Sequence, residues 1–298
     1  MESGYLAIGI FFLSQTALGL LGNSALLCYF ILSNFNGNRV RPTDVIVKHL
    51  TWANIIVLLC KGIPQTMVAF DQTYSLDRVS CKLVFYFHRV ARGVSIGSTS
   101  LLSVFQAITI SAHTSKWAQL KVGAPRIIGL SLGLCWALYL SINYLIIERV
   151  TDMWDKGNLT EFRQFLYCLM IKLPQTTSIV YAIVLATSDV MCLGLMMWAS
   201  GFMVLILFKH KQRVQHIHRS LSSKSFPEAK ATQRILILVS SFVVLYITSA
   251  TLMMYFSFKD GGDAWVINVN VAMSACFPAV CPFLLIRHYA RAFHPCST

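Results

Sequence analysis

The sequence contains few charged residues and lacks the motifs of several enzyme classes. Asp, Glu, Lys and Arg make up only 12% of its 298 residues, whereas hydrophobic residues make up 56%. It has no His-Glu-x-x-His zinc pattern, no Walker phosphate loop and no pair of aspartates within its apolar runs. Catalysis is therefore not expected. Because no carboxylates accompany its buried polar residues, we also expect no metal ion and no cofactor.

Soluble domains do not need the long apolar runs that divide this chain. Seven runs each reach the roughly 20 residues needed to cross a bilayer core of about 30 Å. They predict an all-α integral membrane protein, a seven-helix bundle that forms a single domain over residues 1–298. The first run is too long for a cleaved signal peptide. The predicted spans are Tyr5–Leu32, Thr43–Phe70, Cys81–Ile110, Arg126–Ile147, Ile179–Phe208, Ile235–Phe258 and Ala264–Ile286.

The basic residues predict the orientation of the bundle. With the N-terminus outside and the C-terminus cytosolic, the cytosolic segments hold fifteen cations against two carboxylates, a formal +13. The outside segments hold seven cations against nine carboxylates, a formal −2. This satisfies the positive-inside rule. The net charge of +13 for the whole chain thus indicates orientation and attraction to anionic membrane lipid, not binding of nucleic acid.

Only two of the nine cysteines, Cys81 and Cys168, face outside on this topology. They allow one intrachain disulfide, from the start of the third span to the loop before the fifth. The alternative is two unrelated free thiols. The same loop contains the N-glycosylation sequon Asn158-Leu159-Thr160. We expect a multi-pass protein of the plasma membrane that carries one outside disulfide and a glycan at Asn158.

Ionisable residues within the spans are costly and therefore mark candidate functional positions. They are Lys61, His88, Arg89, Arg92 and Asp189. At 1.5 Å per residue, Arg89 and Arg92 lie about 12 and 16 Å below Cys81, and Asp189 lies about 15 Å below Ile179. One interpretation is an ion pair that only holds helices together. The other is a cationic pocket in which Asp189 holds one arginine while the second binds an acidic or carbonyl-bearing ligand.

Prolines and asparagines within the spans have structural interpretations. Pro64 in the second span, and Pro278 with Pro282 in the seventh, each remove a helical hydrogen bond. Asn23 and Asn54 are expected to form hydrogen bonds among the first, second and seventh helices. We favour this packing role over an ion site.

Several stretches spread over nearly the whole chain together indicate a family. They are Arg41-Pro42-Thr43-Asp44-Val45-Ile46-Val47-Lys48-His49-Leu50, His88-Arg89-Val90-Ala91-Arg92-Gly93-Val94-Ser95-Ile96-Gly97, Leu101-Leu102-Ser103-Val104-Phe105-Gln106-Ala107-Ile108-Thr109, His210-Lys211-Gln212-Arg213-Val214-Gln215-His216-Ile217, Ala231-Thr232-Gln233 and Met273-Ser274-Ala275-Cys276-Phe277-Pro278. They resemble the vomeronasal type-1 receptors, G-protein-coupled receptors taken to detect pheromones and other chemical cues. The resemblance also implies the Cys81–Cys168 bridge and a glycan at a sequon such as Asn158.

The match to the wider rhodopsin-like pattern is partial. Gly22-Asn23 resembles its first-helix motif, but Asn54 stands where an aspartate is usual, which argues against a sodium site. The third span ends Ile110-Ser111-Ala112-His113 where that pattern has Asp-Arg-Tyr. Vomeronasal type-1 receptors lack most of these motifs too, so the departures agree with the resemblance.

The resemblance implies a receptor that binds a small-molecule or peptide chemosignal and signals through an inhibitory-class heterotrimeric G protein. Basic residues flank the expected docking mouth: Lys209, Lys211, Arg213, Lys230 and Arg234. A seven-helix transporter or channel is the main alternative, although the sequence shows no internal repeat. A receptor-like remnant that never reaches the surface is a third interpretation.

Overall fold

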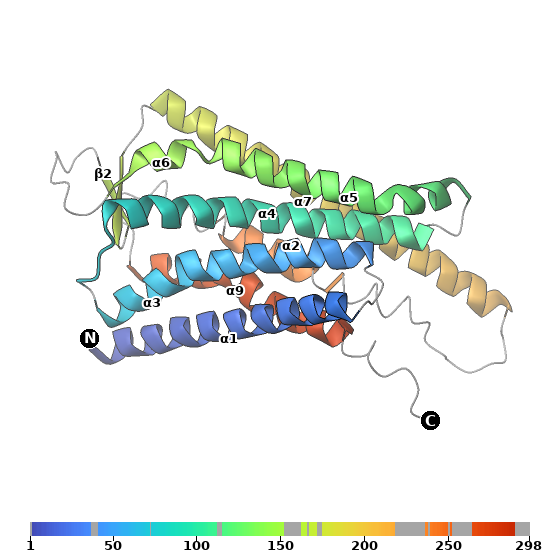
Figure 1. Ribbon diagram of the computed structural model, residues 1–298, viewed down its shortest axis with the longest axis horizontal. Coiled ribbons are helices and arrows are strands. Elements are labelled where there is room, and N and C mark those ends of the chain that lie inside the picture. Colours follow the sequence, from blue (N-terminus) through green and yellow to red (C-terminus); the bar gives the residue numbers. More distant parts are fainter. Residues whose placement is uncertain are drawn as a thin grey trace.

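Long helices form one bundle in the computed structural model of the chain (Figure 1). The structure describes residues 2–36, 41–71, 73–111, 115–151, 162–165, 167–171, 175–217, 236–237, 239–249, 251 and 264–289. The elements in chain order are α1 (Glu2–Phe35), α2 (Pro42–Val57), the π-helical turn η1 (Leu58–Gly62), α3 (Ile63–Phe70), α4 (Arg78–Ser111), α5 (Ser115–Ile142), α6 (Leu145–Arg149), β1 (Val150–Thr151), β2 (Phe162–Phe165), β3 (Cys168–Ile171), α7 (Gln175–Ile217) and α9 (Ala264–Tyr289). A further helical segment, Val239–Ser249, precedes α9.

Six helices in the described residues are long and apolar enough to cross a membrane. The predicted helical membrane bundle is therefore confirmed. The second predicted span is not one regular helix, because α2, η1 and α3 share it. The fourth begins at Ser115 rather than Arg126, and Pro125 lies within the helix. Of the sixth predicted span, the segment Val239–Ser249 is helical, and most of the remainder lies outside the described residues.

Two aspartates at helix starts explain where α2 and α4 begin. In α2, Pro42 occupies the first helical turn, and the Asp44 side chain accepts a hydrogen bond from the Arg41 backbone N–H at 2.9 Å. Before α4, the Asp77 carboxylate accepts from the backbone N–H groups of Val79 and Ser80 at 3.2 and 3.3 Å. Hydrogen bonds from the Ser80 side chain and from this backbone lower the pKa of Asp77.

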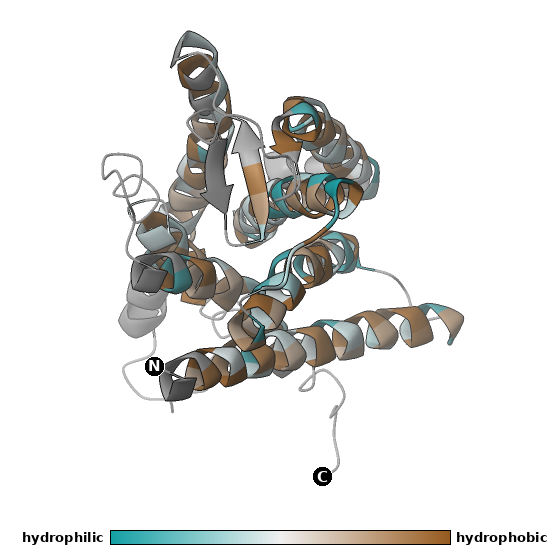
Figure 2. Ribbon diagram, turned by 90° about the vertical axis from the view of Figure 1, so that its left-hand side faces the viewer, coloured by the Kyte–Doolittle hydropathy of each residue, from teal (hydrophilic) through white to brown (hydrophobic). Residues whose placement is uncertain are grey.

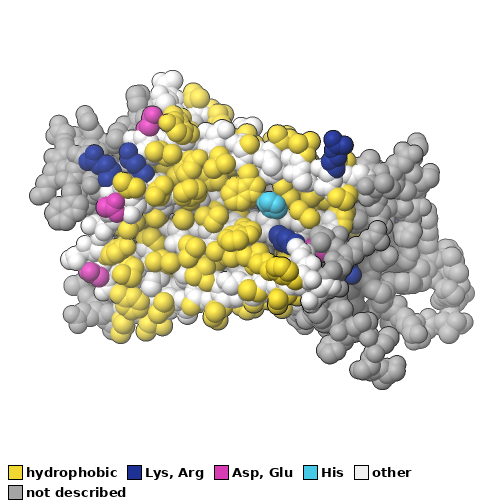
Figure 3. Space-filling model, in the orientation of Figure 1, with side chains coloured by type: hydrophobic (Ala, Val, Ile, Leu, Met, Phe, Trp, Pro, Cys, Tyr) yellow, Lys and Arg dark blue, Asp and Glu magenta, His cyan; other side chains and the backbone are white. Residues whose placement is uncertain are grey.

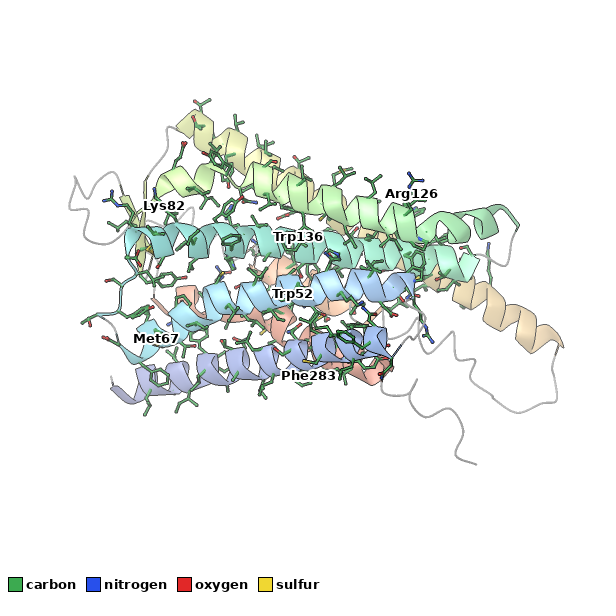
Figure 4. All side chains as sticks on the ribbon, in the orientation of Figure 1. Trp52, Met67, Lys82, Arg126, Trp136 and Phe283 are labelled. Carbon is green, nitrogen blue, oxygen red and sulfur yellow. A yellow bond between two sulfur atoms is a disulfide. The ribbon has the colours of Figure 1, made fainter. Side chains whose placement is uncertain are left out.

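The centre of the bundle is α4, which packs against α2, α5 and α7 and lies between α2 and α5 in Figure 1. The largest buried cluster draws on α1, α2, α4, α5, α7 and α9 and on Val239–Ser249. It includes Leu26, Ile46, Leu50, Ile96, Leu132, Met196, Met203, Phe242 and Phe277. Hydrophobic side chains also cover much of the described surface on the face that Figure 3 shows, and hydrophobic residues recur along the helices in Figure 2. Lys82 and Arg126 lie near opposite ends of the bundle (Figure 4). This pattern is typical of a protein whose sides face lipid.

Close helix contacts depend on glycine at two positions. A Cβ atom on Gly19 of α1 would lie 3.0 Å from the Cα atom of Ala279 in α9, so the absence of a side chain lets the two helices approach. A Cβ atom on Gly93 of α4 would overlap the Tyr139 ring of α5. Both positions fix distances between helices that surround the polar interior.

A small antiparallel sheet in the order β1-β3-β2 lies at one end of the bundle (Figure 1). Its register pairs Val150 with Met170 and Phe165 with Cys168. A disulfide joins Cys168 to Cys81 of α4, with their Cα atoms 6.0 Å apart. This is the pairing expected from the sequence. We call this part of the molecule the disulfide end.

Candidate functional site

The π-helical turn η1 places Lys61 in the bundle interior. Pro64 has no backbone N–H, so the regular hydrogen bond to the Cys60 carbonyl cannot form, and the turn just before it is widened. The Lys61 Nζ atom donates to the Ser274 Oγ atom of α9 at 2.6 Å. Isolated π-turns in helices are frequent at functional sites. A charged side chain presented by such a turn is a strong candidate for function.

Arg89 and Arg92 lie on one face of α4, three residues apart, and each guanidinium faces an aromatic ring. The Arg89 Cζ atom lies 5.9 Å from the centre of the Tyr181 ring of α7. The Arg92 Cζ atom lies 4.8 Å from the centre of the Tyr246 ring in the segment Val239–Ser249. These cation–π contacts orient both arginines toward the interior without neutralising their charge.

Asp189 of α7 contacts a tyrosine rather than an arginine. Among the described side chains, its carboxylate accepts a short hydrogen bond from the Tyr246 hydroxyl, and the ring of the same tyrosine faces Arg92. The expected ion pair of Asp189 with an arginine is thus replaced by a bridge through Tyr246. The sequence did not point to Tyr246, because nothing in an apolar run distinguishes a bridging tyrosine from a packing one. The bridge connects α4, α7 and Val239–Ser249.

The interior cations lie close enough to influence one another. The charges of Arg89 and Arg92 act on Lys61, and all three act on His88. The His88 Nε2 atom is buried and has no hydrogen-bond partner in the part of the chain that the structure describes. We name Lys61, His88, Arg89 and Arg92 the cationic cluster. With Asp189 as the carboxylate in these spans, the formal interior charge is +2 when His88 is neutral.

A pocket opens beside this cluster, with about 410 Å³ of space between its atoms when its open mouth is included. Its polar lining consists of Arg92, Ser95, Tyr246, Ser249 and Ser274. Its apolar lining consists of Val57, Phe242, Leu245, Met273, Phe277 and Pro278. The Phe242 and Phe277 rings meet edge to face, with centres 4.4 Å apart. The arrangement suits a small molecule with an apolar body and one polar group directed at Arg92.

The sheet contributes a buried aromatic residue at the disulfide end. The Tyr167 side chain packs against Phe85 of α4, with ring centres 5.8 Å apart. Its backbone carbonyl accepts a hydrogen bond from the Leu76 N–H group at 3.4 Å. Burial raises the pKa of Tyr167, because the phenolate would lose its hydration. Tyr167 therefore anchors the sheet to the helices from inside, next to the disulfide.

One stretch of α4 has the spacing of a catalytic motif. Gly93-Val94-Ser95-Ile96-Gly97 matches the Gly-x-Ser-x-Gly pattern of a nucleophile elbow. That elbow requires a sharp turn from a strand into a helix, whereas this stretch lies within the continuous helix α4. The Ser95 Oγ atom donates to the Asn54 Oδ1 atom at 3.0 Å. The glycines accommodate α5, and Ser95 is not activated as a nucleophile by any described histidine.

The structure describes only some of the remaining predicted site residues. Lys209 is exposed on α7, and the same helix carries Lys211 and Arg213 as it continues to Ile217. Asn158, Lys230 and Arg234 lie outside the described residues. The glycosylation site and the expected docking mouth therefore stay predictions.

Comparison with known proteins identifies the family. A sequence model described as the "Vomeronasal organ pheromone receptor family" matches residues 6–298. Vomeronasal type-1 receptor 4 of Homo sapiens is 47% identical over 287 residues, which cover 96% of this chain and 95% of that receptor. The Pongo pygmaeus receptor of the same name is 47% identical over 297 residues, covering 99% of this chain and 98% of the relative.

Vomeronasal type-1 receptor 2 of Homo sapiens is 44% identical over 286 residues, covering 96% of this chain and 72% of that receptor. These likenesses extend over nearly the full chain, and none of them supports a transporter or channel. The chain belongs to the vomeronasal type-1 receptor family and is a multi-pass membrane protein, a chemosensory G-protein-coupled receptor of the pheromone-receptor type.

Proposed function

We propose that this receptor binds a small chemosignal in the pocket beside Arg92 and transmits its occupancy to an inhibitory-class heterotrimeric G protein. The observation that carries the proposal is the position of Arg92, a guanidinium within a membrane span that also lines the pocket. Charged residues inside spans are costly and mark ligand or ion pathways. Its contact with the Tyr246 ring leaves the Arg92 charge for a ligand.

The chemistry of the pocket favours an acidic or carbonyl-bearing molecule. The interior charge is positive, and Ser249 and Ser274 add hydroxyl groups to the same wall. The phenylalanine pair of Phe242 and Phe277 supplies an apolar surface for the body of the ligand. This mixture of one cation, hydroxyl groups and apolar side chains suits a small molecule.

This proposal can be tested by screening a panel of chemicals on cells that express the receptor with a promiscuous G protein. We expect acidic or carbonyl agonists whose potency falls about tenfold or more in Arg92→Met, because hydrogen bonds to charged groups contribute about 1.5–3 kcal/mol. Lys82→Met is the matched control, since Lys82 lies at the disulfide end and does not line the pocket. Equal potency in Arg92→Met and wild type at equal surface expression would contradict the site.

The proposed orientation places the N-terminus and the disulfide end outside and the C-terminus in the cytosol. The charge asymmetry of the sequence supports it. Asn158→Gln tests it, because a glycan forms only on the lumenal side. We expect glycosidase treatment to increase the gel mobility of the wild-type receptor and to leave Asn158→Gln unchanged. Surface labelling of the same samples also tests whether the receptor reaches the plasma membrane.

Coupling is proposed to follow from a shift between two conformations. A ligand that prefers the state in which the cytosolic helix ends part also favours binding of a G protein there, and the two stabilise each other's bound state. Lys209, Lys211 and Arg213 of α7, with Lys230 and Arg234, would flank that docking mouth.

The triple variant Lys209→Gln, Lys211→Gln, Arg213→Gln tests this mouth. Agonist-induced inhibition of cyclic AMP production should weaken, while ligand binding to the isolated receptor persists. Lys82→Gln is the control at the other end of the bundle. Full signalling by the triple variant, with normal orientation and surface expression, would exclude these residues from coupling.

A further inference from the structure

The cationic cluster carries more positive charge than the one carboxylate within the spans can balance. Lys61, Arg89 and Arg92 face a single aspartate, Asp189. That carboxylate accepts a hydrogen bond from Tyr246, whose ring lies against Arg92, so its negative charge is held on the Arg92 side of the cluster. The formal charges of Lys61 and Arg89 therefore require another group to balance them, because charges buried in a protein are normally paired.

The described carboxylates at the disulfide end do not supply this balance. Asp71, Asp77 and Glu148 are all exposed. The Asp71 carboxylate accepts from the Thr73 backbone N–H at 2.9 Å, and the Asp77 carboxylate accepts from the Ser80 backbone N–H at 3.3 Å. Both aspartates thus bond to their own loop or helix start rather than to the interior.

His88 directs an open polar atom into this positive surrounding. In the part of the chain that the structure describes, the charges that act on His88 are those of Lys61, then Arg92 and Arg89, and all three are positive. Its Nε2 atom is buried, and no described group forms a hydrogen bond with it. Buried polar atoms normally have a partner. A neutral imidazole can carry its proton on Nε2 and donate it, so an anion is the partner that both the donor and the surrounding charge favour.

Lys61 and Arg89 also keep donors for such a partner. The Lys61 ammonium has three N–H groups, and one of them goes to the Ser274 Oγ atom at 2.6 Å. The Arg89 guanidinium faces the ring of Tyr181, whose hydroxyl donates to the Asn143 Oδ1 atom at 3.3 Å. Contact with a ring face orients the guanidinium but does not satisfy its five N–H donors. Because η1 packs against α4, the donors of both elements can reach one small ion.

We propose that Lys61, His88 and Arg89 bind one small inorganic anion, which is chloride under physiological conditions, whether or not a chemosignal is present. A halide is spherical and accepts hydrogen bonds from any direction, so it suits donors that come from two helices. Its single negative charge offsets part of the formal +2 of the interior. The three residues are not among those that line the pocket, so the anion and the chemosignal occupy different places.

Thermal unfolding of the purified receptor without any chemosignal tests the anion site. The receptor is unfolded in sodium gluconate and in sodium chloride at the same ionic strength, about 0.15 M. We expect Tm to be about 3–6 °C higher once chloride exceeds its Kd about tenfold, because an ion that binds only the folded state stabilises it. Bromide should replace chloride, whereas the larger gluconate should not. An equal Tm in chloride and gluconate would overturn the site.

Variants of the cluster distinguish a bound anion from a general effect of salt. Lys61→Met removes a charge and His88→Leu removes a donor, so each should reduce the rise of Tm in chloride by at least half. His88→Gln keeps an N–H donor and should retain most of the rise, as should the matched control Lys82→Met at the disulfide end. A rise of equal size in wild type, Lys61→Met and His88→Leu would overturn the proposal. Because no chemosignal is present, that result would not count against the ligand pocket beside Arg92.

Discussion

The polar interior differs between the two halves of the bundle. The half nearer the disulfide holds charged groups, which we call the charged half: Lys61, His88, Arg89, Arg92 and Asp189. The other half holds neutral amides and hydroxyls, which we call the neutral half: Asn23, Asn54, Ser95, Ser98, Thr99 and Ser103. In the neutral half, Thr99 and Ser103 donate to carbonyls of their own helix. In the charged half, side chains contact other helices.

This difference in polar groups indicates that the charged half recognises the ligand and that the neutral half holds the helices together. Neutral groups that bond to nearby backbone or to each other hold helices at small cost. An excess of cations inside a membrane protein is tolerated only where the charges face partners or a cavity. The pocket lies at the boundary of the halves, with Arg92 from one and Ser95 from the other on its wall. The chemistry of the ligand should therefore depend on the charged half, whereas the stability of the receptor should depend on both halves.

The largest expected effect comes from removing the disulfide that anchors the charged half. Cys81→Ser or Cys168→Ser should destabilise the receptor by about 2–5 kcal/mol and abolish most of its surface expression. The bridge links residues 87 positions apart and holds the sheet to α4. Thermal unfolding in detergent and surface labelling are the measurements.

The cysteine prediction has a matched control and a consistency test. Cys28→Ser changes an exposed free cysteine of α1 and should leave Tm and surface expression unchanged. The double variant of Cys81 and Cys168 should behave like either single variant, because each alone removes the bond. Additive losses in the double variant would instead indicate that the two thiols act separately.

The loss of a hydrogen bond to a charged group should lower the free energy of unfolding more than the loss of one between neutral groups, although both losses should be smaller than that of the disulfide. Tyr246→Phe leaves the Asp189 carboxylate without its donor and should cost about 1.5–3 kcal/mol. Ser95→Ala removes a donor to the neutral Asn54 oxygen and should cost about 0.5–1.5 kcal/mol. Chemical unfolding of both variants measures the difference. Equal losses would show that charge does not distinguish the two halves energetically.

The sequence predicted the features that depend on composition or on topology alone. Long apolar runs identify membrane spans whatever the arrangement of the helices in the bundle, so the sequence alone predicted a helical membrane protein. The pairing of Cys81 with Cys168 followed from their predicted side of the membrane. The interior charges were recognised because such residues are rare in spans, and the structure gathers Lys61, His88, Arg89 and Arg92 as one cluster.

The sequence did not predict the features that depend on how helices and strands pack against one another. The short strands β2 and β3 carry no distinctive alternation, so the sheet was not predicted. Pro64 suggested a kink, but the π-turn that presents Lys61 also depends on how α2 packs against α1 and α9. Tyr246 could not be identified as the partner of Asp189, because the choice between a tyrosine and an arginine is made by helix rotation.

The boundary between the halves depends on a close contact of α4 with α5. Gly93→Ala places a methyl group against the Tyr139 ring and should destabilise the receptor by about 1–3 kcal/mol. Gly133→Ala is the matched control on α5, because no atom lies within 4 Å of its added Cβ. That substitution should be neutral or stabilising, since alanine favours helix over glycine. Similar unfolding temperatures for the two variants would contradict the contact.

The smallest expected effect lies at the start of α4, where Asp77 caps the helix that carries both arginines. Its pKa is lowered in the folded state, so the carboxylate stabilises the fold at neutral pH, and this contribution is lost as the pH falls below about 4 and through the depressed value. Asp77→Asn should lower Tm slightly at pH 7. The difference from wild type should shrink as the pH falls through the depressed pKa of Asp77, because the aspartate then becomes uncharged like the asparagine. Asp44→Asn at the start of α2 gives the comparison at the opposite end of the bundle. A Tm difference for Asp77→Asn that does not shrink on acidification would show that the charge of Asp77 does not stabilise the helix start.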